Sequence, residues 1–335
     1  MHDAQFYTQL DDGRLQCTLC PRYCKLKAGQ HGFCYVRKNV NGTLKTLVYG
    51  KPYAVNVDPI EKKPLYHFLP GTKIVSIGTA GCNMACKYCQ NWDLSEAKFN
   101  ESRSMDLPPG RLVQLAEHYE SPSIAYTYNE PTIFAEYAMD TARLCQKAHI
   151  KNVMVTNGYI SEEVIDEVYE YIDAANVDLK AFTDTFYEKL TLSKLQPVLT
   201  ALKRFKKLNK WIEITTLIIP TYNDDETELS RMCEWILTEL DPFVPVHFTA
   251  FHPDYQLKNV APTTPTTLIK IRHLALNLGL KYVYIGNVGN SEGSHTNCHH
   301  CSKLLIKRSW YSTEIVGLEN GNCKYCGTQI PGIFH

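Results

Sequence analysis

The sequence of 335 residues lacks a net charge, because 35 basic side chains balance 35 acidic ones. It therefore gives no general electrostatic reason to expect an anionic partner, and it disfavours nucleic acid without excluding it. No apolar run approaches the roughly 18 residues that a membrane span needs. The first fifteen residues also lack the apolar core of a signal peptide. We expect a cytoplasmic protein with no membrane partner.

Cysteine, by contrast, is abundant, with 13 residues. Disulfides are rarely kept in the cytosol, so metal or iron–sulfur ligation becomes the leading explanation. Cys145 and Cys233 stand alone in segments of helical pattern and are expected to be small buried hydrophobes. The other eleven form three clusters: Cys17, Cys20, Cys24 and Cys34; Cys82, Cys86 and Cys89; and Cys298, Cys301, Cys323 and Cys326.

From about residue 73, short β-branched runs alternate with longer amphipathic segments. This pattern predicts a parallel sheet with crossover helices. Helices are expected to begin at Pro108-Pro109, at Ser161 and at Thr264-Pro265. Six such βα units favour an α/β fold, a partial (β/α)6 TIM-like barrel. The predicted strands are residues 73–78, 123–128, 151–156, 174–181, 211–219, 244–251 and 281–286.

Three segments are expected along the chain. Residues 1–65 form a Cys-rich N-terminal segment that holds a metal or an auxiliary cluster, and residues 66–290 form the core barrel. Residues 291–335 form a tail that resembles a zinc ribbon or rubredoxin. A stretch rich in Gly, Asn and Ser at 289–294 is typical of a linker between the last two.

The central motif has the spacing C-x3-C-x2-C from Cys82 to Cys89 and follows the first predicted strand. Three thiolates this close can bind one [4Fe–4S] cluster and leave one iron without a protein ligand. Catalysis needs such an open position, as catalytic zinc sites also show. The spacing alone leaves a second interpretation, a zinc or structural cluster that a distant fourth residue completes.

This motif, together with Gln90-Asn91-Trp92, resembles the radical S-adenosylmethionine (SAM) superfamily. The chain looks most like the branch of pyruvate formate-lyase activating enzymes and, more narrowly, the radical SAM proteins of the AmmeMemoRadiSam system. The resemblance implies that the amino and carboxylate groups of SAM chelate the open iron. An electron from the cluster then cleaves SAM to methionine and a 5′-deoxyadenosyl radical. It thus implies an oxidoreductase that abstracts hydrogen from an unidentified substrate, a protein being one option.

Polar residues follow several predicted strands at the end where barrel active sites are built. Glu130 stands in Asn129-Glu130-Pro131, where the superfamily usually has Gly-Gly-Glu-Pro, and its carboxylate is the natural acceptor for the SAM ammonium group. Period-two alternation places Tyr126, Tyr128 and Glu130 on one face if the strand continues that far. The alternative for Glu130 is a surface carboxylate before a turn proline.

Asp178 and Lys180 point the same way on the fourth predicted strand, where charges are costly unless they are paired or functional. The activating enzymes share this Asp-Leu-Lys, which implies SAM contacts for both residues; a structural ion pair is the alternative. Asn157 and His252 match SAM-proximal positions of that branch. The resemblance therefore implies one set of SAM-binding residues: Asn129, Glu130, Asn157, Asp178, Lys180 and His252.

The two flanking clusters each supply four thiols. In the tail, Cys298-x2-Cys301 and Cys323-x2-Cys326 predict a closed structural site for zinc, with a single iron or an auxiliary cluster as competitor. The N-terminal spacing from Cys17 to Cys34 suits an auxiliary iron–sulfur cluster and a structural zinc equally well. Basic residues nearby, Arg22, Lys25 and Lys27, are candidates for docking an acidic reductant such as flavodoxin or ferredoxin.

Two other functions stay open from the sequence. The first is activation of a glycyl-radical enzyme, which the resemblance to activating enzymes suggests. The second is a zinc-dependent binding or scaffold protein in which the central cysteines are only structural. Neutral charge argues mildly against an RNA-binding version of that scaffold.

Overall fold

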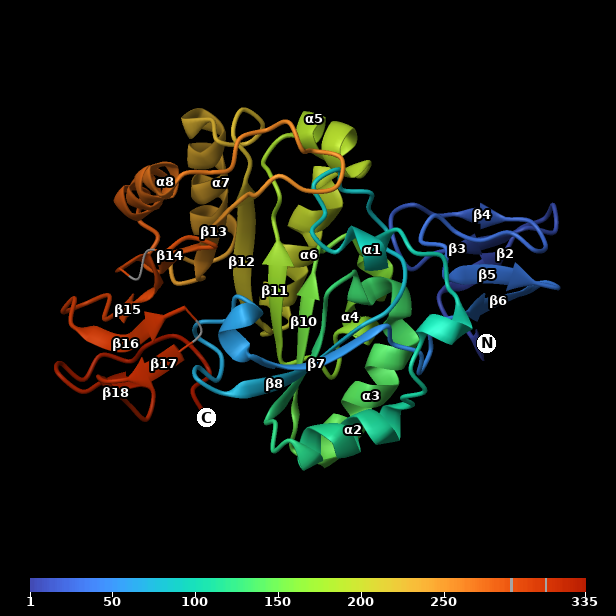
Figure 1. Ribbon diagram of the computed structural model, residues 1–335, viewed down its shortest axis with the longest axis horizontal. Coiled ribbons are helices and arrows are strands. Elements are labelled where there is room, and N and C mark those ends of the chain that lie inside the picture. Colours follow the sequence, from blue (N-terminus) through green and yellow to red (C-terminus); the bar gives the residue numbers. More distant parts are fainter. Residues whose placement is uncertain (290–291, 311) are drawn as a thin grey trace.

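The computed structural model describes residues 1–289, 292–310 and 312–335. At its centre lies an eight-stranded sheet in the order β14-β13-β12-β11-β10-β9-β8-β7 (Figure 1). Strands β8 to β14 are all parallel, whereas β7 (Ala54–Pro59) runs antiparallel to β8. Since β7 and β14 are the two edges of this sheet, the barrel is partial.

All seven predicted strands are present, and most are shorter than their hydrophobic runs. They are β8 (Lys73–Gly78), β9 (Ser123–Tyr126), β10 (Lys151–Thr156), β11 (Ala174–Asp178), β12 (Trp211–Ile218), β13 (Val246–Ala250) and β14 (Val283–Gly286). The edge strand β7 was not predicted, and it lies inside the segment 1–65 that the sequence set apart from the barrel. The central sheet therefore begins before residue 65.

Strand β9 is shorter than predicted and does not continue to Glu130. The strand ends at Tyr126, and Tyr128 adopts a left-handed conformation with φ +68°, so the alternation does not reach Glu130. The Tyr126 hydroxyl lies 3.0 Å from Asn152 Oδ1, whereas the Tyr128 hydroxyl donates to Asp58 at 2.7 Å. A bend that sequence periodicity cannot register therefore aims these side chains at different partners.

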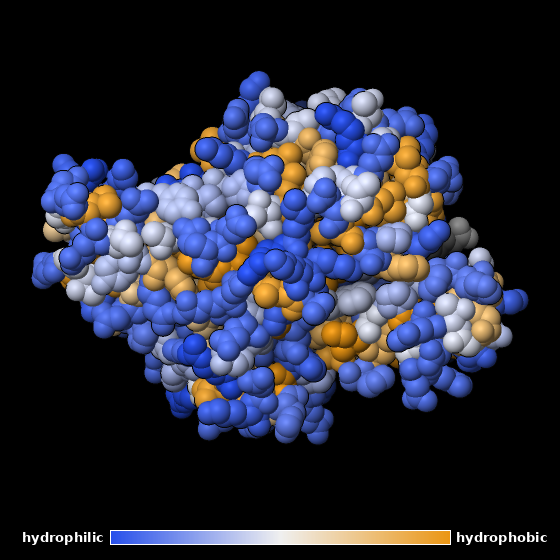
Figure 2. Space-filling model, turned by 180° about the vertical axis from the view of Figure 1, so that it is seen from behind, coloured by the Kyte–Doolittle hydropathy of each residue, from blue (hydrophilic) through white to orange (hydrophobic). Residues whose placement is uncertain are grey.

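Helices connect successive parallel strands and cover the outside of the sheet (Figure 1). Helix α2 starts at the predicted prolines, and α8 starts after Thr264, whose hydroxyl accepts a hydrogen bond from the amide of Thr267. The connecting helices are α2 (Pro109–His118), α3 (Ala135–Lys147), α4 (Ile165–Val168), α6 (Leu195–Lys207), α7 (Glu226–Glu239) and α8 (Pro265–Leu278). Seen from behind, hydrophobic side chains form small patches separated by hydrophilic ones (Figure 2). Among the described residues, no helix is both long and apolar enough to traverse a bilayer.

The two Cys-rich ends of the chain lie on opposite sides of this sheet (Figure 1). The N-terminal end forms two small sheets, β1-β6-β5 and β2-β3-β4, from β1 (His2–Asp3), β2 (Tyr7–Gln9), β3 (Leu15–Cys17), β4 (Lys25–Leu26), β5 (Arg37–Val40) and β6 (Thr43–Thr46). The C-terminal end contains β15 (Thr296–Asn297), β16 (Leu304–Ser309), β17 (Ser312–Ile315), β18 (Leu318–Glu319) and β19 (Asn322–Cys323). Residues 290 and 291, within the predicted linker, lie outside the described residues.

The base of the barrel is closed by two segments, one that precedes the parallel strands in the sequence and one that follows them. The segment after β7 inserts Ile60, Leu65 and Phe68 against inward-facing residues of β9 to β11. The carboxylate of Glu213 on β12 accepts hydrogen bonds from the amides of Tyr66 and His67. Ile333 pairs with this segment through bonds to His67 and Leu69. The C-terminal end thus docks under the barrel.

His67 should make the stability of this fold sensitive to acid. Its ring lies fully buried between the Pro331 carbonyl at 2.7 Å and the Tyr284 hydroxyl at 2.6 Å. Burial lowers the pKa of His67 to about 4, against the opposing effect of Glu213. Because the unfolded state binds the extra proton, stability is complete above the ordinary histidine pKa and declines as pH falls toward 4. The loss amounts to about 3 kcal/mol.

Urea unfolding between pH 7.5 and 4.5 measures this decline. The His67→Gln variant should show a flatter pH dependence, while a matched change at exposed His118 should leave it intact. Equal slopes for His67→Gln and the unmodified protein would contradict the assignment.

Candidate functional site

The loop that follows β8 carries Cys82, Cys86 and Cys89 and is held from several neighbouring segments. Backbone amides of Ala85 and Lys87 donate to Thr191 and Leu190 carbonyls at 3.0 and 2.9 Å. From within the loop, the Asn83 side chain donates to the Tyr159 carbonyl at 2.7 Å. The loop therefore has a fixed path at the carboxyl end of the sheet, which is where ligand sites of α/β barrels form.

The three thiols of this loop are half-buried, in surroundings that disfavour free thiolates. Burial raises the pKa of Cys86 to about 12 and the pKa of Cys82 well above its usual value. Charge on a neighbouring thiol of the loop raises the pKa of each of these two further. A cationic metal centre bound by all three removes this electrostatic cost. The residues present thus fit an iron–sulfur cluster with three protein ligands.

Asn129 braces the cluster loop from the next strand. Its side-chain oxygen accepts from the Thr79 amide at 3.0 Å, and its amide nitrogen donates to the Gly81 carbonyl at 2.7 Å. Gly81 itself has φ +87°, and a Cβ built on it would lie 2.2 Å from the Cys34 carbonyl oxygen. A residue with a side chain does not fit there, so the loop requires glycine immediately before Cys82.

Glu130 is buried, with 1% of its surface exposed, and it connects β9 to β10. Its carboxylate accepts hydrogen bonds from the amides of Thr132 and Asn157 at 2.9 and 2.7 Å and from the Thr156 hydroxyl at 2.8 Å. Burial raises the pKa of Glu130. The carboxylate is therefore engaged by protein donors and is not the surface group of the alternative interpretation. SAM contact by Glu130 stays a prediction.

Asn157 lies directly beside the cluster loop. Its side-chain amide donates to Asn83 Oδ1 at 2.9 Å and lies 3.9 Å from Cys82 Sγ, while its backbone amide donates to Glu130. The structure thus brings Asn157, Glu130 and Cys82 together. Sequence reasoning missed Asn83 and Thr156, although both stand inside the motifs that it singled out.

Asp178 and Lys180 form an ion pair of 2.9 Å at the carboxyl end of β11. Burial lowers the pKa of Lys180, but the charges of Asp178 and Cys86 outweigh it and raise that pKa well above its usual value. Lys180 is therefore a permanent cation next to the cluster loop. The two side chains pair with each other, as the alternative interpretation has it, and both interact through charge with Cys86; SAM contact by either residue stays a prediction.

His252 follows β13 and is exposed. Its Nε2 lies 3.4 Å from the Asn287 carbonyl oxygen, and it makes no contact with the cluster loop among the interactions of the described residues. Of the six residues expected to bind SAM, five surround the cluster loop through bonds or charge, and His252 stands apart.

Comparisons with known proteins agree with this geometry. The model of the radical SAM superfamily matches residues 76–233, which span β8 to α7. An uncharacterized protein of Methanocaldococcus jannaschii is 44% identical over 332 residues, 98% of this chain and 99% of that one. The chain belongs to the radical SAM superfamily. Pyruvate formate-lyase 1-activating enzyme of Escherichia coli is 26% identical, covering 64% of this chain and 93% of that one.

The radical SAM fold is also shared with a solved structure. A radical SAM methyltransferase from Sphaerobacter thermophilus superposes with a TM-score of 0.52 at 15% identity, over 71% of each chain. At that identity the likeness shows the fold alone. The matched superfamily region contains the cluster loop, Glu130, Asn157 and the ion pair on β11, whereas both Cys-rich ends lie outside it.

Four sulfurs converge outside the radical SAM core, in the C-terminal module. The Sγ atoms of Cys298, Cys301, Cys323 and Cys326 all lie within 4.8 Å of one another, with separations of 3.7 Å for Cys298–Cys326 and 3.6 Å for Cys301–Cys323. Four thiolates at about 2.3 Å from one zinc in a tetrahedron lie about 3.8 Å apart. The group therefore fits a single metal ion, and the sequence prediction of a closed four-thiol site is compatible with it.

The N-terminal thiols are arranged differently. Cys17, Cys20, Cys24 and Cys34 line a small cavity between the N-terminal sheets and the radical SAM loop. Burial and charge on the other three thiols raise the pKa of Cys20, and burial raises the pKa of Cys34 to about 11. All four cysteines thus line one cavity.

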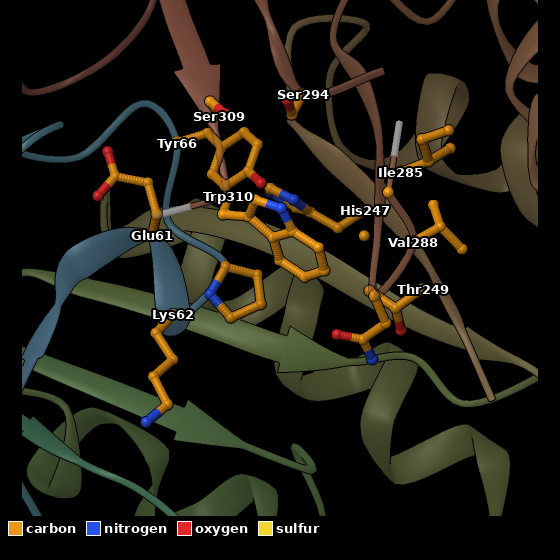
Figure 3. Close-up of a pocket in the computed structure, with 14 residues that line it drawn as sticks. Glu61, Lys62, Tyr66, His247, Thr249, Ile285, Val288, Ser294, Ser309 and Trp310 are labelled. Carbon is orange, nitrogen blue, oxygen red and sulfur yellow. The ribbon is translucent and has the colours of Figure 1, made fainter. Parts of the chain in front are cut away.

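A larger cavity of about 320 Å³ lies on the side of the barrel that faces the C-terminal module. Figure 3 shows Trp310, from the turn after β16, reaching into its middle, with Lys62 on one side and Thr249 on the other. In the register of the sheet, Asp178 pairs with Thr215 and Thr215 with His247, another cavity residue. Two strand spacings, about 10 Å, therefore separate the ion pair from the cavity wall.

Proposed function

We propose that the protein is an enzyme that cleaves SAM reductively at a [4Fe–4S] cluster bound by Cys82, Cys86 and Cys89, and then abstracts hydrogen from a substrate. The observation that carries this proposal is a loop with three half-buried thiols that interact through charge, beside the cationic Lys180 and inside the radical SAM region. When bound, the cluster supplies an open iron and the electron for the cleavage.

The chain's own residues then bind and orient SAM. In this proposal, Lys180 pairs with the carboxylate of SAM, and Asp178, its ion-pair partner, holds the lysine in position. Glu130 fixes the path of residues 130–132 and 156–157 through three hydrogen bonds, which makes it a positioning residue as well as a candidate acceptor for the SAM ammonium group. Asn157 orients the loop at Cys82. His252 has the weakest support, because it stands apart from this group.

We assign substrate binding to the cavity of about 320 Å³, whose wall lies two strand spacings from the ion pair. Its volume is that of a small-ligand pocket. Its lining includes Gly286 at the carboxyl end of β14, where α/β proteins bind ligands, and extends back to His247 near the start of β13. Polar groups from the barrel and an indole from the C-terminal module line it. We infer that the module, with zinc in its four-thiol site, holds Trp310 over the substrate.

Anaerobic reconstitution with iron and sulfide tests the proposed function. After dithionite reduction, electron paramagnetic resonance should show a [4Fe–4S]⁺ signal that shifts when SAM is added, and chromatography should detect 5′-deoxyadenosine. A protein that binds only zinc, or a cluster whose signal ignores SAM, would instead favour the zinc-dependent scaffold.

Lys180→Met should weaken SAM binding at least about tenfold, because one charged hydrogen bond of about 1.5–3 kcal/mol is lost. Equilibrium binding of SAM to the reconstituted protein measures the change. Lys258→Met removes an exposed lysine as the matched control and should leave the affinity unchanged. The same affinity in both variants would remove Lys180 from the SAM site.

Activation of a glycyl-radical enzyme is the second candidate, favoured by the relative named pyruvate formate-lyase 1-activating enzyme. We also propose that the protein belongs to the AmmeMemoRadiSam branch. It would act in the cytoplasm and receive electrons from a reductant of the flavodoxin or ferredoxin type. A glycyl radical that appears in a partner protein after incubation with SAM and the reduced enzyme would establish activation. Its absence would leave hydrogen abstraction from another substrate.

A further inference from the structure

The four N-terminal cysteines occupy a built site that the radical SAM chemistry itself does not use. Cys17 and Cys34 are buried, and Cys20 and Cys24 are half-buried. Cys17 ends β3, Cys20 and Cys24 lie in the turn between β3 and β4, and Cys34 lies between β4 and β5, so the fold brings Cys34 to the other three. All four cysteines line the same cavity.

The spacing of these thiols separates two kinds of metal centre. In the C-terminal module, four sulfurs crowd within 4.8 Å, as one tetrahedral ion requires. Across the part of the chain that the structure describes, the N-terminal thiols do not form such a compact group, and neither do the three thiols of the radical SAM loop. A cubane cluster spreads its thiolate ligands over four different irons, so it needs the wider arrangement.

The cavity also shares a wall with the radical SAM loop. Asn83, which follows Cys82, lines it together with Thr132 and Ile133. From the N-terminal side, Arg22 donates from Nε to the Asn83 carbonyl oxygen, and its guanidinium lies 3.4 Å from the centroid of the Phe33 ring. The carbonyl of Cys34 rests against Gly81. The two groups of cysteines thus meet through Cys34 and through residues that adjoin or nearly adjoin a cysteine in sequence: Gly81 contacts Cys34, and Asn83 contacts Arg22.

A buried ion pair fixes the wall in place. Arg37 lines the cavity and binds both oxygens of Glu136 on α3 at 2.8 and 2.9 Å, with both side chains at most 2% exposed. Removing one partner of such a pair strongly destabilises a protein. The pair therefore ties the N-terminal sheets, through Arg37, to helix α3 of the barrel. An arginine beside the cavity also offsets the negative charge that four thiolates bring.

We propose that Cys17, Cys20, Cys24 and Cys34 bind a second [4Fe–4S] cluster, fully ligated by the protein and adjacent to the catalytic one. Four protein ligands leave it no open iron, so it does not bind SAM. Its place beside Asn83 and Gly81 puts it between the solvent-facing N-terminal sheets and the SAM site.

A variant without the catalytic ligands isolates this site. With Cys82, Cys86 and Cys89 all replaced by Ala, the anaerobically reconstituted protein should retain about four iron and four sulfide ions per chain. On reduction it should give a [4Fe–4S]⁺ signal that SAM leaves unchanged. The expectation does not depend on SAM cleavage, so it stands or falls separately from the proposed function.

Adding Cys20→Ser and Cys24→Ser to that variant should abolish the remaining signal, while adding Cys145→Ala and Cys233→Ala should preserve it. Mössbauer spectra of the unmodified protein give a second measurement that needs no variant. They should show two cubane clusters, of which only one responds to SAM. Zinc in place of iron at the N-terminal thiols, or the absence of any cubane in the variant without Cys82, Cys86 and Cys89, would overturn the proposal.

Discussion

Replacing Cys86 with Ala should leave the chain folded and lower 5′-deoxyadenosine formation by about 1000-fold or more, equivalent to about 4 kcal/mol of activation free energy. With two thiols left, the loop no longer holds the cluster whose open iron binds SAM. Fold retention is expected because the loop is anchored by backbone bonds of Ala85 and Lys87, which the substitution does not touch.

The measurement is single-turnover formation of 5′-deoxyadenosine by reconstituted protein under dithionite. Cys233→Ala provides the control, since that thiol is fully buried in the core away from the site. It should reduce stability modestly and keep the activity. If the Cys86 variant cleaved SAM at an unaltered rate, the assignment of Cys86 as a ligand of the catalytic cluster would be wrong.

Gly81→Ala should destabilise the protein by about 3 kcal/mol or more and impair the assembly of the catalytic cluster. The alanine Cβ would lie 2.2 Å from the Cys34 carbonyl oxygen, and the backbone would keep a left-handed conformation with φ +87°. Left-handed strain alone costs about 1 kcal/mol, and the contact with a backbone carbonyl adds a displacement of the N-terminal turn. The N-terminal turn at Cys34 and the cluster loop after Gly81 should both become less well packed.

Urea unfolding and the iron content after reconstitution measure the two effects. Gly110→Ala is the matched control: this glycine lies in α2, and a Cβ there meets nothing within 4 Å. That variant should be neutral or slightly more stable, because alanine favours helices. If Gly81→Ala matched Gly110→Ala in stability and iron content, the close packing of Gly81 on Cys34 would be unimportant.

Most of the barrel followed from periodicity, because buried parallel strands are continuous apolar runs that local sequence displays. The edge strand β7 did not, since the sequence Ala54–Pro59 alternates weakly and its role depends on pairing with β8. The bend at Tyr128 was equally invisible. A left-handed tyrosine is a tertiary effect, stabilised here by its hydroxyl bond to Asp58.

The candidate site, too, was only partly predictable from the sequence. Cysteine spacing predicted three metal centres, because ligands of one centre lie close together in sequence. The partners of Glu130 did not follow from its motif, since Thr156 and Asn157 come from the next strand. Spacing also left the N-terminal centre undecided between zinc and a cubane. Only the three-dimensional separation of the thiols favours one of them.

The docking of the C-terminal end under the barrel bears on the order in which the molecule is built. His67 bonds to Pro331, 264 positions further along the chain, and Ile333 pairs with the same segment. During synthesis the ribosome must therefore release the whole barrel before its base can close. Until then the apolar floor at Phe68 and the acid-sensitive His67 stay uncovered. Closure of the floor by Pro331 and Ile333 is therefore a late event in folding.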